Sequence, residues 1–325
     1  MESARDCRPG RLSNEFRLND NGGQLNAQHV SPYAEWMVEG SGGSVAEREA
    51  AGTVAAVRPQ SLMLTFLGIY VLGHGTAVFS GSVIDVFGRV GVSQQATRST
   101  LTRMVRRDLL RRHRRGRRMY FGLTPRCDLV LREGDQRVWR AGVVDREWDG
   151  TWTMLGFSLP ENWRSQRHRL RSRLVWGGFG PLQSGMWVSP SRVDVPALVE
   201  GLGLDGYLKV LVGHPGPPTW DRDLIHGAYD IPGIAASYQA FLRRWGQPRP
   251  LAGAPDALAR QLLLHAEWLQ LIRKNPRLPA EHLPAGWPAI EAERLFEQLA
   301  AAHAGPATVI AATLLDTIEV GPPGP

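Results

Sequence analysis

The chain has 325 residues, of which 43% are hydrophobic and 21% charged, and its formal net charge is +7. These proportions are typical of a globular protein, and the length suits two or three domains. No apolar run approaches the roughly 20 residues of a membrane span, and the N-terminus lacks an apolar signal core. The cysteines, Cys7 and Cys127, show neither metal-ligand spacing nor a disulfide framework, so we expect a protein of the reducing cytoplasm.

Residues 1–57 are polar and contain glycine, without a sustained hydrophobic period, and predict a disordered tail. Met37 could serve as an alternative start of translation. Order is expected from Arg58, because an apolar segment over residues 62–72 predicts a largely buried first helix. Glycines at positions 73 and 75 would end that helix.

The most strongly charged stretch is residues 93–124. From Arg98 to Arg118 it holds ten arginines and one acid, Asp108, so it carries more positive charge than the whole chain. Such a concentrated positive field is typical of a surface that holds a polyanion. The alternative is a solvated basic face on an ordinary helix, since charge runs are commonly surface decoration.

The first part of this stretch predicts the second helix of a helix-turn-helix. Ser93 can cap it, and its apolar side is expected to be core. A shorter helix over residues 80–90 precedes it across a glycine-containing turn. The core residues expected are Ala96, Leu101, Met104 and Val105. The side chains expected to contact bases and nearby phosphates are Gln95, Arg98, Ser99, Thr102 and Arg103.

The second part predicts a β-hairpin. Residues 109–113 and 117–121 have strand composition on either side of a turn over residues 114–116, where a glycine permits tight backbone geometry. This hairpin would be the wing of a winged helix. The side chains expected to bind the DNA backbone are Arg106, Arg114, Arg115, Arg117 and Arg118.

The remaining chain predicts an α+β fold. Strand and helix patterns alternate in a β-α-β-α-β order that fits half or more of a ferredoxin-like sandwich, and beyond residue 219 only helical periodicity is found. His265, on the apolar face of one of these helices, is expected to be a satisfied core residue. The strands are expected at 152–159, 186–189 and 207–212, and the helices at 126–139, 161–176, 195–202, 237–245, 255–273 and 289–303.

The expected domains follow from this order. They are a tail (1–57), a winged helix-turn-helix DNA-binding domain (58–125), a connector helix (126–147), a ferredoxin-like domain (148–218) and an all-α C-terminal domain for effector binding and dimerisation (219–325).

Four segments, in chain order, resemble the PaaX family of bacterial transcriptional repressors. They are residues 96–105 with 117–125, residues 148–152 (WDGTW) with 157–161, residues 174–182 with 185–190, and residues 275–287. The resemblance covers about residues 58–303. It implies a homodimeric repressor of a catabolic operon, such as one for phenylacetate, bound to a palindromic operator and released by an aryl-acyl-CoA such as phenylacetyl-CoA.

For the anionic, aromatic effector that the resemblance implies, five residues are candidate binding residues. The candidates are Trp148, Trp152, Arg167, Arg171 and Arg173. Aromatic residues in an α+β core more often pack than bind ligands. No metal and no other cofactor is expected.

The enzyme alternative is a metal-dependent nuclease, because the family's middle domain is similar to small CRISPR-associated nucleases. That chemistry needs carboxylates around a divalent cation. The end of the first strand of this domain, where those nucleases place an aspartate, holds Gly156 and Ser158 instead. Asp145, Asp149 and Glu161 flank the strand and have the pattern of turn and helix-start residues. We therefore expect no enzyme.

A general nucleic-acid-binding protein is the third class considered. It would bind any sequence with a steep salt dependence and would gain from exposed aromatic side chains that stack on bases. Only Tyr120 and Phe121 qualify within the basic stretch.

Overall fold

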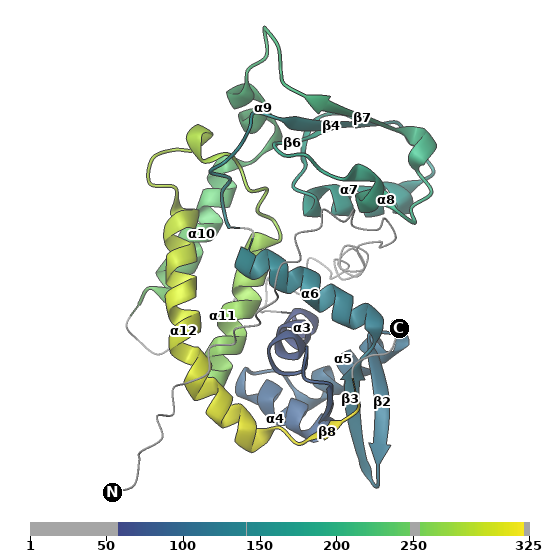
Figure 1. Ribbon diagram of the computed structural model, residues 1–325, viewed down its shortest axis with the longest axis vertical. Helices are drawn as coiled ribbons and strands as arrows, with labels where there is room; N and C mark the ends of the chain where they lie inside the picture. Colours follow the sequence, from purple (N-terminus) through teal and green to yellow (C-terminus); the bar gives the residue numbers. More distant parts are fainter. Residues whose placement is uncertain (1–57, 141, 248–253, 322–325) are drawn as a thin grey trace, which may run out of the picture.

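The computed structural model describes residues 58–140, 142–247 and 254–321. Within them the chain has two four-stranded antiparallel sheets connected by long helices (Figure 1), so the α+β class is confirmed. In this part of the chain no helix combines the length and apolarity that crossing a membrane requires. The predicted tail, with Cys7 and Met37, lies outside the described residues.

The first sheet has the strand order β2-β3-β1-β8. Its elements are α3 (Pro59–Tyr70), β1 (Thr76–Phe79), α4 (Ser80–Arg89), α5 (Gln94–Arg106), β2 (Leu110–Arg115), β3 (Arg118–Leu123) and, from the C-terminal end, β8 (Thr317–Glu319). Proline at the first helical position starts α3, whose residues Leu62 to Leu67 are all buried. We call α3, α4, α5 and this sheet the first-sheet unit.

The strand β8 corrects the prediction that residues after 219 are all helical. It pairs antiparallel with β1, with Thr76 opposite Glu319 and Val78 opposite Thr317. Neither β1 nor β8 was predicted, because segments of four and three residues are too short for an alternating pattern to stand out. Their pairing with distant partners makes them strands, and it ties the C-terminal end of the chain to the first-sheet unit.

The second sheet has the strand order β5-β6-β4-β7. Its elements are β4 (Trp152–Phe157), α7 (Arg164–Trp176), β5 (Gly180–Gln183), β6 (Met186–Ser189), α8 (Val195–Val199) and β7 (Leu208–Gly213). The strand β5 was missed, which makes the order β-α-β-β-α-β. Glycine and proline are unfavourable inside a strand, so the sequence of β5 does not indicate one. However, β5 lies at the edge of the sheet and its register is irregular between Pro181 and Gln183, where such residues are tolerated.

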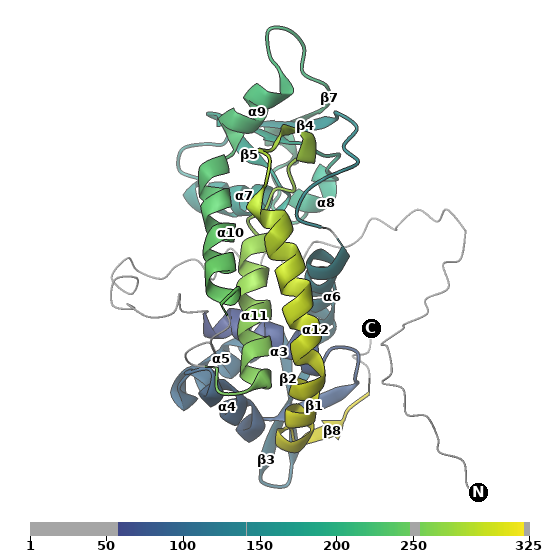
Figure 2. The same cartoon turned by 90° about the vertical axis from the view of Figure 1, so that its left-hand side faces the viewer.

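Long helices connect the two sheets. The helix α6 (Pro125–Arg140) follows the hairpin, and α9 (Asp221–Ala228), α10 (Ile231–Trp245), α11 (Ala257–Ile272) and α12 (Pro288–Leu314) follow the second sheet. Figure 2 shows α10, α11 and α12 side by side along the molecule. Within α6, Cys127 is fully buried and burial raises the pKa of its thiol to about 12, which fits a packing role.

The helix α12 continues past its predicted end at residue 303 and includes Pro306. A proline inside a helix removes a backbone hydrogen bond. Beyond it, Ala307 and Ala311 are buried in the core of the first-sheet unit. Burial of this last part of α12 therefore stabilises a helix that local propensity would end earlier.

Two hydrophobic cores hold these elements together. One joins the first-sheet unit to α11, the end of α12 and the α7 face of the second sheet, where Leu155 lies. The other joins the opposite face of that sheet, where Trp152 lies, to α9, α10, α11 and α12. Trp152 and Leu155 face opposite ways because side chains alternate along a strand. The C-terminal helices thus pack against both sheets.

Candidate nucleic-acid interface

The inner face of α5 anchors the helix. Ser93 Oγ accepts a hydrogen bond from the Ala96 N–H at 3.2 Å, as predicted for an N-cap. Leu101 and Met104 are buried as predicted. Thr97 and Thr100 are buried as well. Their hydroxyls donate to backbone carbonyls one turn earlier, so these buried polar groups keep a hydrogen-bond partner.

The outer face of α5 is polar and open. Gln95, Arg98, Ser99, Arg103 and Arg106 are exposed, and Thr102 is half-buried. These six side chains, with Ser93 and Gln94, line a shallow surface depression of about 970 Å³. The structure therefore brings all the predicted base-contacting residues, and Arg106, onto one helix face.

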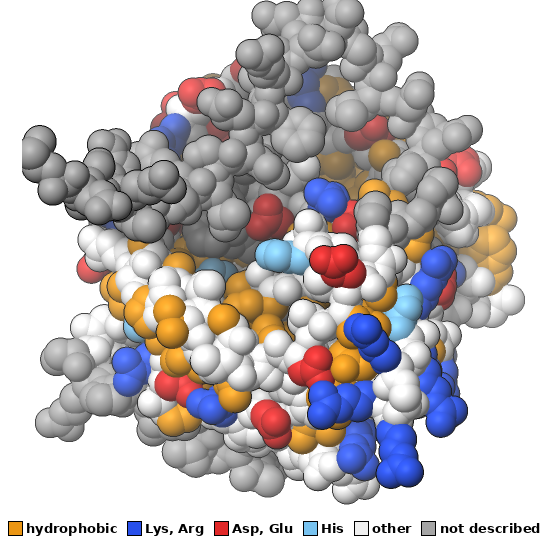
Figure 3. All heavy atoms as spheres, turned by 60° about the horizontal axis from the view of Figure 1, so that its bottom comes forward, with side chains coloured by type: hydrophobic (Ala, Val, Ile, Leu, Met, Phe, Trp, Pro, Cys, Tyr) orange, Lys and Arg blue, Asp and Glu red, His pale blue; other side chains and the backbone are white. Residues whose placement is uncertain are grey.

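The hairpin carries the second set of arginines. The exposed ones are Arg111, Arg112, Arg114, Arg115, Arg117 and Arg118. In the view of Figure 3, Lys and Arg side chains, coloured blue, gather along one edge of the molecule. Gly116 has φ +61° and is the first of the two turn residues between β2 and β3, 116 and 117, whereas the sequence analysis expected the turn over residues 114–116. Arg114 Nε donates to the Gly116 carbonyl at 3.1 Å, which holds that side chain along the turn.

One predicted phosphate-binding residue is engaged within the chain. Arg118 forms an ion pair with Asp316, with 2.5 Å between Nη1 and Oδ2. The Tyr120 hydroxyl also donates to this carboxylate, and the Arg118 guanidinium lies 5.2 Å from the centre of the Phe79 ring. No local sequence signal could reveal this, because Asp316 comes from the segment between α12 and β8.

Both aromatic residues of the basic stretch face inward. Tyr120 and Phe121 are buried, and the Tyr120 ring packs 5.6 Å from that of Phe79. Neither side chain is available for stacking on bases. The hairpin thus lacks the feature that would favour a general single-strand-binding surface.

The candidate effector residues are divided between the two faces of the second sheet. Trp152 is buried on the face toward the C-terminal helices, where Nε1 donates to Asp221 at 2.7 Å, and its ring lies 5.9 Å from that of Trp148. Arg167 and Arg173 extend from α7, on the other face. Their guanidiniums donate to backbone carbonyls: Arg167 to residues 159 and 160, and the buried Arg173 to residues 198 and 200. Arg171 is exposed. The structure does not bring these five side chains together.

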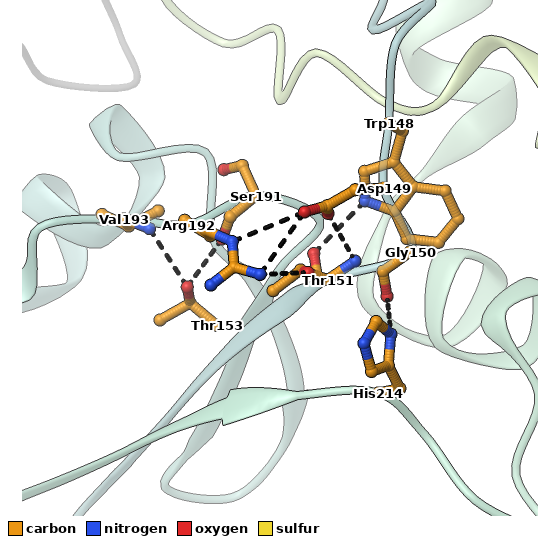
Figure 4. A network of polar contacts seen from close by, with 9 residues as sticks. All are labelled: Trp148, Asp149, Gly150, Thr151, Thr153, Ser191, Arg192, Val193 and His214. Carbon is orange, nitrogen blue, oxygen red and sulfur yellow. Dashed lines mark hydrogen bonds and ion pairs between the residues drawn. The ribbon is translucent and has the colours of Figure 1, made fainter.

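The turn before β4 is held by a polar network (Figure 4). Asp149 accepts from the Thr151 N–H at 2.9 Å and pairs with Arg192, which also donates to Thr151 Oγ1. Hydrogen bonds from Thr151, followed by the charge of Arg192, hold the pKa of Asp149 below its ordinary value. This carboxylate organises the turn, as its sequence position indicates.

The other acids near β4 form no metal-binding arrangement. Asp145 Oδ1 accepts from the Glu147 N–H at 3.0 Å, which is another local turn contact, and Glu161 is exposed before α7. Across residues 58–140, 142–247 and 254–321, no three His, Cys, Asp or Glu side chains are grouped so that they could hold a metal ion.

Comparison with known proteins gives matches over most of the described chain. Three family models match: PaaX-like protein over residues 58–127, PaaX protein central Cas2-like domain over residues 145–225, and PaaX-like protein C-terminal domain over residues 229–313. The transcriptional repressor PaaX of Escherichia coli (strain K12) is 25% identical over 252 residues, which cover 72% of this chain and 77% of that protein.

A solved structure supports the same fold. An uncharacterized protein from Mycobacterium tuberculosis superposes with a TM-score of 0.53 at 22% identity, covering 78% of this chain and 99% of its own. The family matches and the similarity to the E. coli repressor define the class: a transcriptional regulator rather than an enzyme. The chain belongs to the PaaX family.

Proposed function

We propose that the chain is a DNA-binding transcriptional repressor in which α4 and α5 form a helix-turn-helix and the β2–β3 hairpin is its wing. The observation that carries the proposal is the outer face of α5. This helix of 13 residues is about 20 Å long and presents amide, hydroxyl and guanidinium groups on one side. Such groups match the hydrogen-bonding edges of bases in the major groove.

The hairpin arginines supply contacts to the DNA backbone. Arg114, Arg115 and Arg117 are exposed on the hairpin, whose strand β2 contacts α5, and Arg106 is the exposed last residue of α5. Guanidiniums bind phosphates through paired hydrogen bonds. These residues position the protein on DNA of any sequence, and the residues of α5 select the operator.

The proposed domains keep the predicted boundaries at 58–125, 126–147, 148–218 and 219–325. The β-α-β-β-α-β order of the second sheet supports a ferredoxin-like middle domain, in agreement with the Cas2-like family model that matches it. In its described residues the last domain is helical apart from β8, which adds a strand to the sheet of the first domain.

The repressor is proposed to act as a homodimer on a palindromic operator, and β7 supports a dimer. This strand is at the edge of the described second sheet, and Val210, Leu211 and Val212 are exposed on it. An exposed apolar edge strand can pair with the same strand of a second copy about a twofold axis. Two recognition helices would then enter major grooves about 34 Å apart.

The proposed effector is an aryl-acyl-CoA, such as phenylacetyl-CoA, supported by family membership. It would release DNA by binding more tightly to a form of the dimer in which the two α5 helices no longer match successive grooves. The regulated operon would then be one that degrades the parent aromatic acid in the cytoplasm.

Fluorescence anisotropy tests this proposal. Purified full-length protein is titrated into labelled DNA from its own upstream intergenic region, with scrambled duplex as competitor and aryl-acyl-CoA thioesters as additives. We expect tight binding that the competitor does not remove and that one thioester releases. If scrambled duplex competes as well as the labelled DNA does, the protein is a general nucleic-acid-binding protein. If binding is specific but no thioester releases the DNA, the proposed effector class is wrong.

A further inference from the structure

The helix α7 carries a second concentration of positive charge, apart from α5 and the hairpin. Its 13 residues include five arginines and neither aspartate nor glutamate. Because a helix turns through about 100° per residue, Arg164, Arg167 and Arg171 lie within an arc of about 60°. Arg164 and Arg171 are exposed, and Arg167 is half-buried. We call these three residues the α7 arginine stripe, and no part of the proposed function uses it.

The stripe has no anionic partner within the part of the chain that the structure describes. There, Arg164 and Arg171 form no hydrogen bond or ion pair, and the Arg167 guanidinium donates to two backbone carbonyls at 3.1 Å each. Glu161, exposed before the helix, forms no ion pair with the stripe. Like charges three and four positions apart destabilise a helix, and Arg164 begins α7, where a positive charge opposes the helix dipole. A bound polyanion would offset both effects.

The spacing of the stripe suits a run of phosphates. From Arg164 to Arg171 the helix rises about 10 Å, whereas each strand of B-DNA carries a phosphate about every 3.4 Å along the duplex axis. The guanidiniums can therefore bind neighbouring phosphates of one strand through paired N–H groups. The aromatic residue beside the stripe, Trp163, packs its ring 5.1 Å from that of Tyr207. Contact with the backbone of a duplex is thus favoured over stacking on single-stranded bases.

The helix α6 connects α7 to the hairpin. Trp176, the last residue of α7, donates from Nε1 to Glu133 Oε1 of α6 at 3.1 Å. The helix α6 begins at Pro125, directly after the hairpin, and Glu133 lies about 12 Å along it. Figure 1 shows α7 between the second sheet and α6. A duplex that is held by the hairpin and extends from it by one turn, about 34 Å, is long enough to reach α7.

We propose that the α7 arginine stripe binds the phosphate backbone of the same duplex that α5 and the hairpin hold, outside the bases that α5 reads. This second contact rests on the proposed DNA binding. Because it reaches phosphates, it raises the affinity for any duplex of sufficient length and does not select the operator. The phosphates of an acyl-CoA offer the same chemistry, and the experiments below distinguish the two sources.

A salt titration tests the stripe. Arg164→Gln/Arg171→Gln removes two exposed guanidiniums, and glutamine retains good helix propensity. On a random duplex of about 40 base pairs we expect about tenfold lower affinity at low salt, and a slope of log affinity against log salt that is smaller by about 2. Arg222→Gln/Arg243→Gln makes the same charge change at exposed positions of α9 and α10, and should leave the slope unchanged. Equal effects of the two double variants would overturn the proposal.

Tethered cleavage locates the contact. Ser165→Cys, in a Cys7→Ser background, provides a thiol for an iron–EDTA reagent on the exposed first turn of α7, whereas Cys127 is fully buried and should not react. We expect this conjugate to cut DNA from the upstream region, and the Ser237→Cys conjugate, exposed on α10, to leave it intact. Cuts at discrete positions would accompany operator binding. Cuts spread over the whole duplex would reject the operator and keep the α7 contact. Operator binding without cuts would overturn this proposal and keep the repressor.

Two other anionic partners are tested with the same double variant of α7. In equilibrium dialysis with radiolabelled acetyl-CoA, binding that the wild type shows and the variant loses would assign the stripe to a thioester effector. In titrations of single-stranded RNA of the same length, a larger loss of affinity than on duplex DNA would assign the stripe to RNA. Either result would overturn the proposal. We expect the variant to bind acetyl-CoA as the wild type does, and to lose more affinity for the duplex than for RNA.

Discussion

Arg118 donates a hydrogen bond from Nη1 to Oδ2 of Asp316 at 2.5 Å, although 198 positions separate the two residues in the chain. Asp316 makes further contacts at the same place. Its backbone N–H donates to Ser82 Oγ at 3.0 Å, and its carbonyl accepts from the Phe79 N–H at 2.8 Å. Asp316 alone thus contacts the hairpin, the first helix of the proposed helix-turn-helix and β1.

Asp316→Asn should strengthen DNA binding at low salt. The substitution removes a negative charge beside the hairpin and leaves the Arg118 guanidinium uncompensated, so one more cation can displace counterions from DNA. The slope of log affinity against log salt should become steeper by about 1. Anisotropy titrations between low and moderate salt measure this slope. Asp205→Asn makes the same charge change on the exposed 3₁₀ turn before β7, and an equal effect there would point to net charge rather than to the pair.

The hairpin arginines should differ in their importance for DNA affinity. Arg115→Ala removes an exposed cation and should weaken binding to operator and random duplex alike. Arg118→Ala should have a smaller effect, because Asp316 already balances that charge. Parallel titrations of both variants on both duplexes measure the order. A larger loss for Arg118→Ala would mean that its pair opens on DNA.

Substitutions on α5 should reduce sequence preference. Arg98→Ala or Arg103→Ala is expected to lower operator affinity by about 1–3 kcal/mol, because a paired contact with a guanine edge is lost. Affinity for random duplex should fall much less. Competition titrations with both duplexes give the ratio. Equal losses on operator and random DNA would assign these residues to the phosphates.

His265 should make stability depend on pH. Its pKa is lowered by burial from 6.5 to about 4, so the unfolded chain binds the proton first as the solution is acidified. The stabilisation is complete above the unfolded pKa and is lost as pH falls toward 4. Between pH 7 and 5 the wild type should lose about 2 kcal/mol more free energy of unfolding than His265→Gln. Urea denaturation of both proteins at the two pH values isolates this difference from the titration of the acids.

The dimer contact should depend on β7. Leu211 has 66% of its surface exposed on the edge strand, and Val309 has 68% exposed on α12. Leu211→Lys should shift the protein toward monomer in sedimentation velocity, whereas Val309→Lys should not, because paired strands cannot accommodate facing charges. The opposite result would place the interface on the C-terminal helices, where the sequence led us to expect it.

The sequence predicts the interface helix well because its signals are local. Ser93 as cap, the buried Leu101 and Met104, and the polar arc with Arg98 and Arg103 all follow from a period of 3.6 residues. The hairpin is found to within two residues for a similar reason, since Gly116 lies between two short runs of strand-forming composition.

The features that the sequence does not predict depend on distant partners. The strands β1 and β8 are too short to be recognised until they are paired. The sequence suggests that Arg173 is one of several surface arginines. It is buried instead, and its guanidinium donates hydrogen bonds to the carbonyls of Leu198 and Glu200. Likewise, nothing in the sequence around Asp316 indicates that this residue pairs with Arg118.

The position of β8 bears on how the protein is made. A ribosome finishes residues 58–125 long before it reaches residue 317, so the nascent first sheet lacks an outer strand for most of synthesis. During that time the edge of β1 that β8 covers in the finished protein lacks that strand. The protein can therefore assemble its full nucleic-acid-binding unit only once translation has passed Glu319, and an early stop codon would release chains with that edge open.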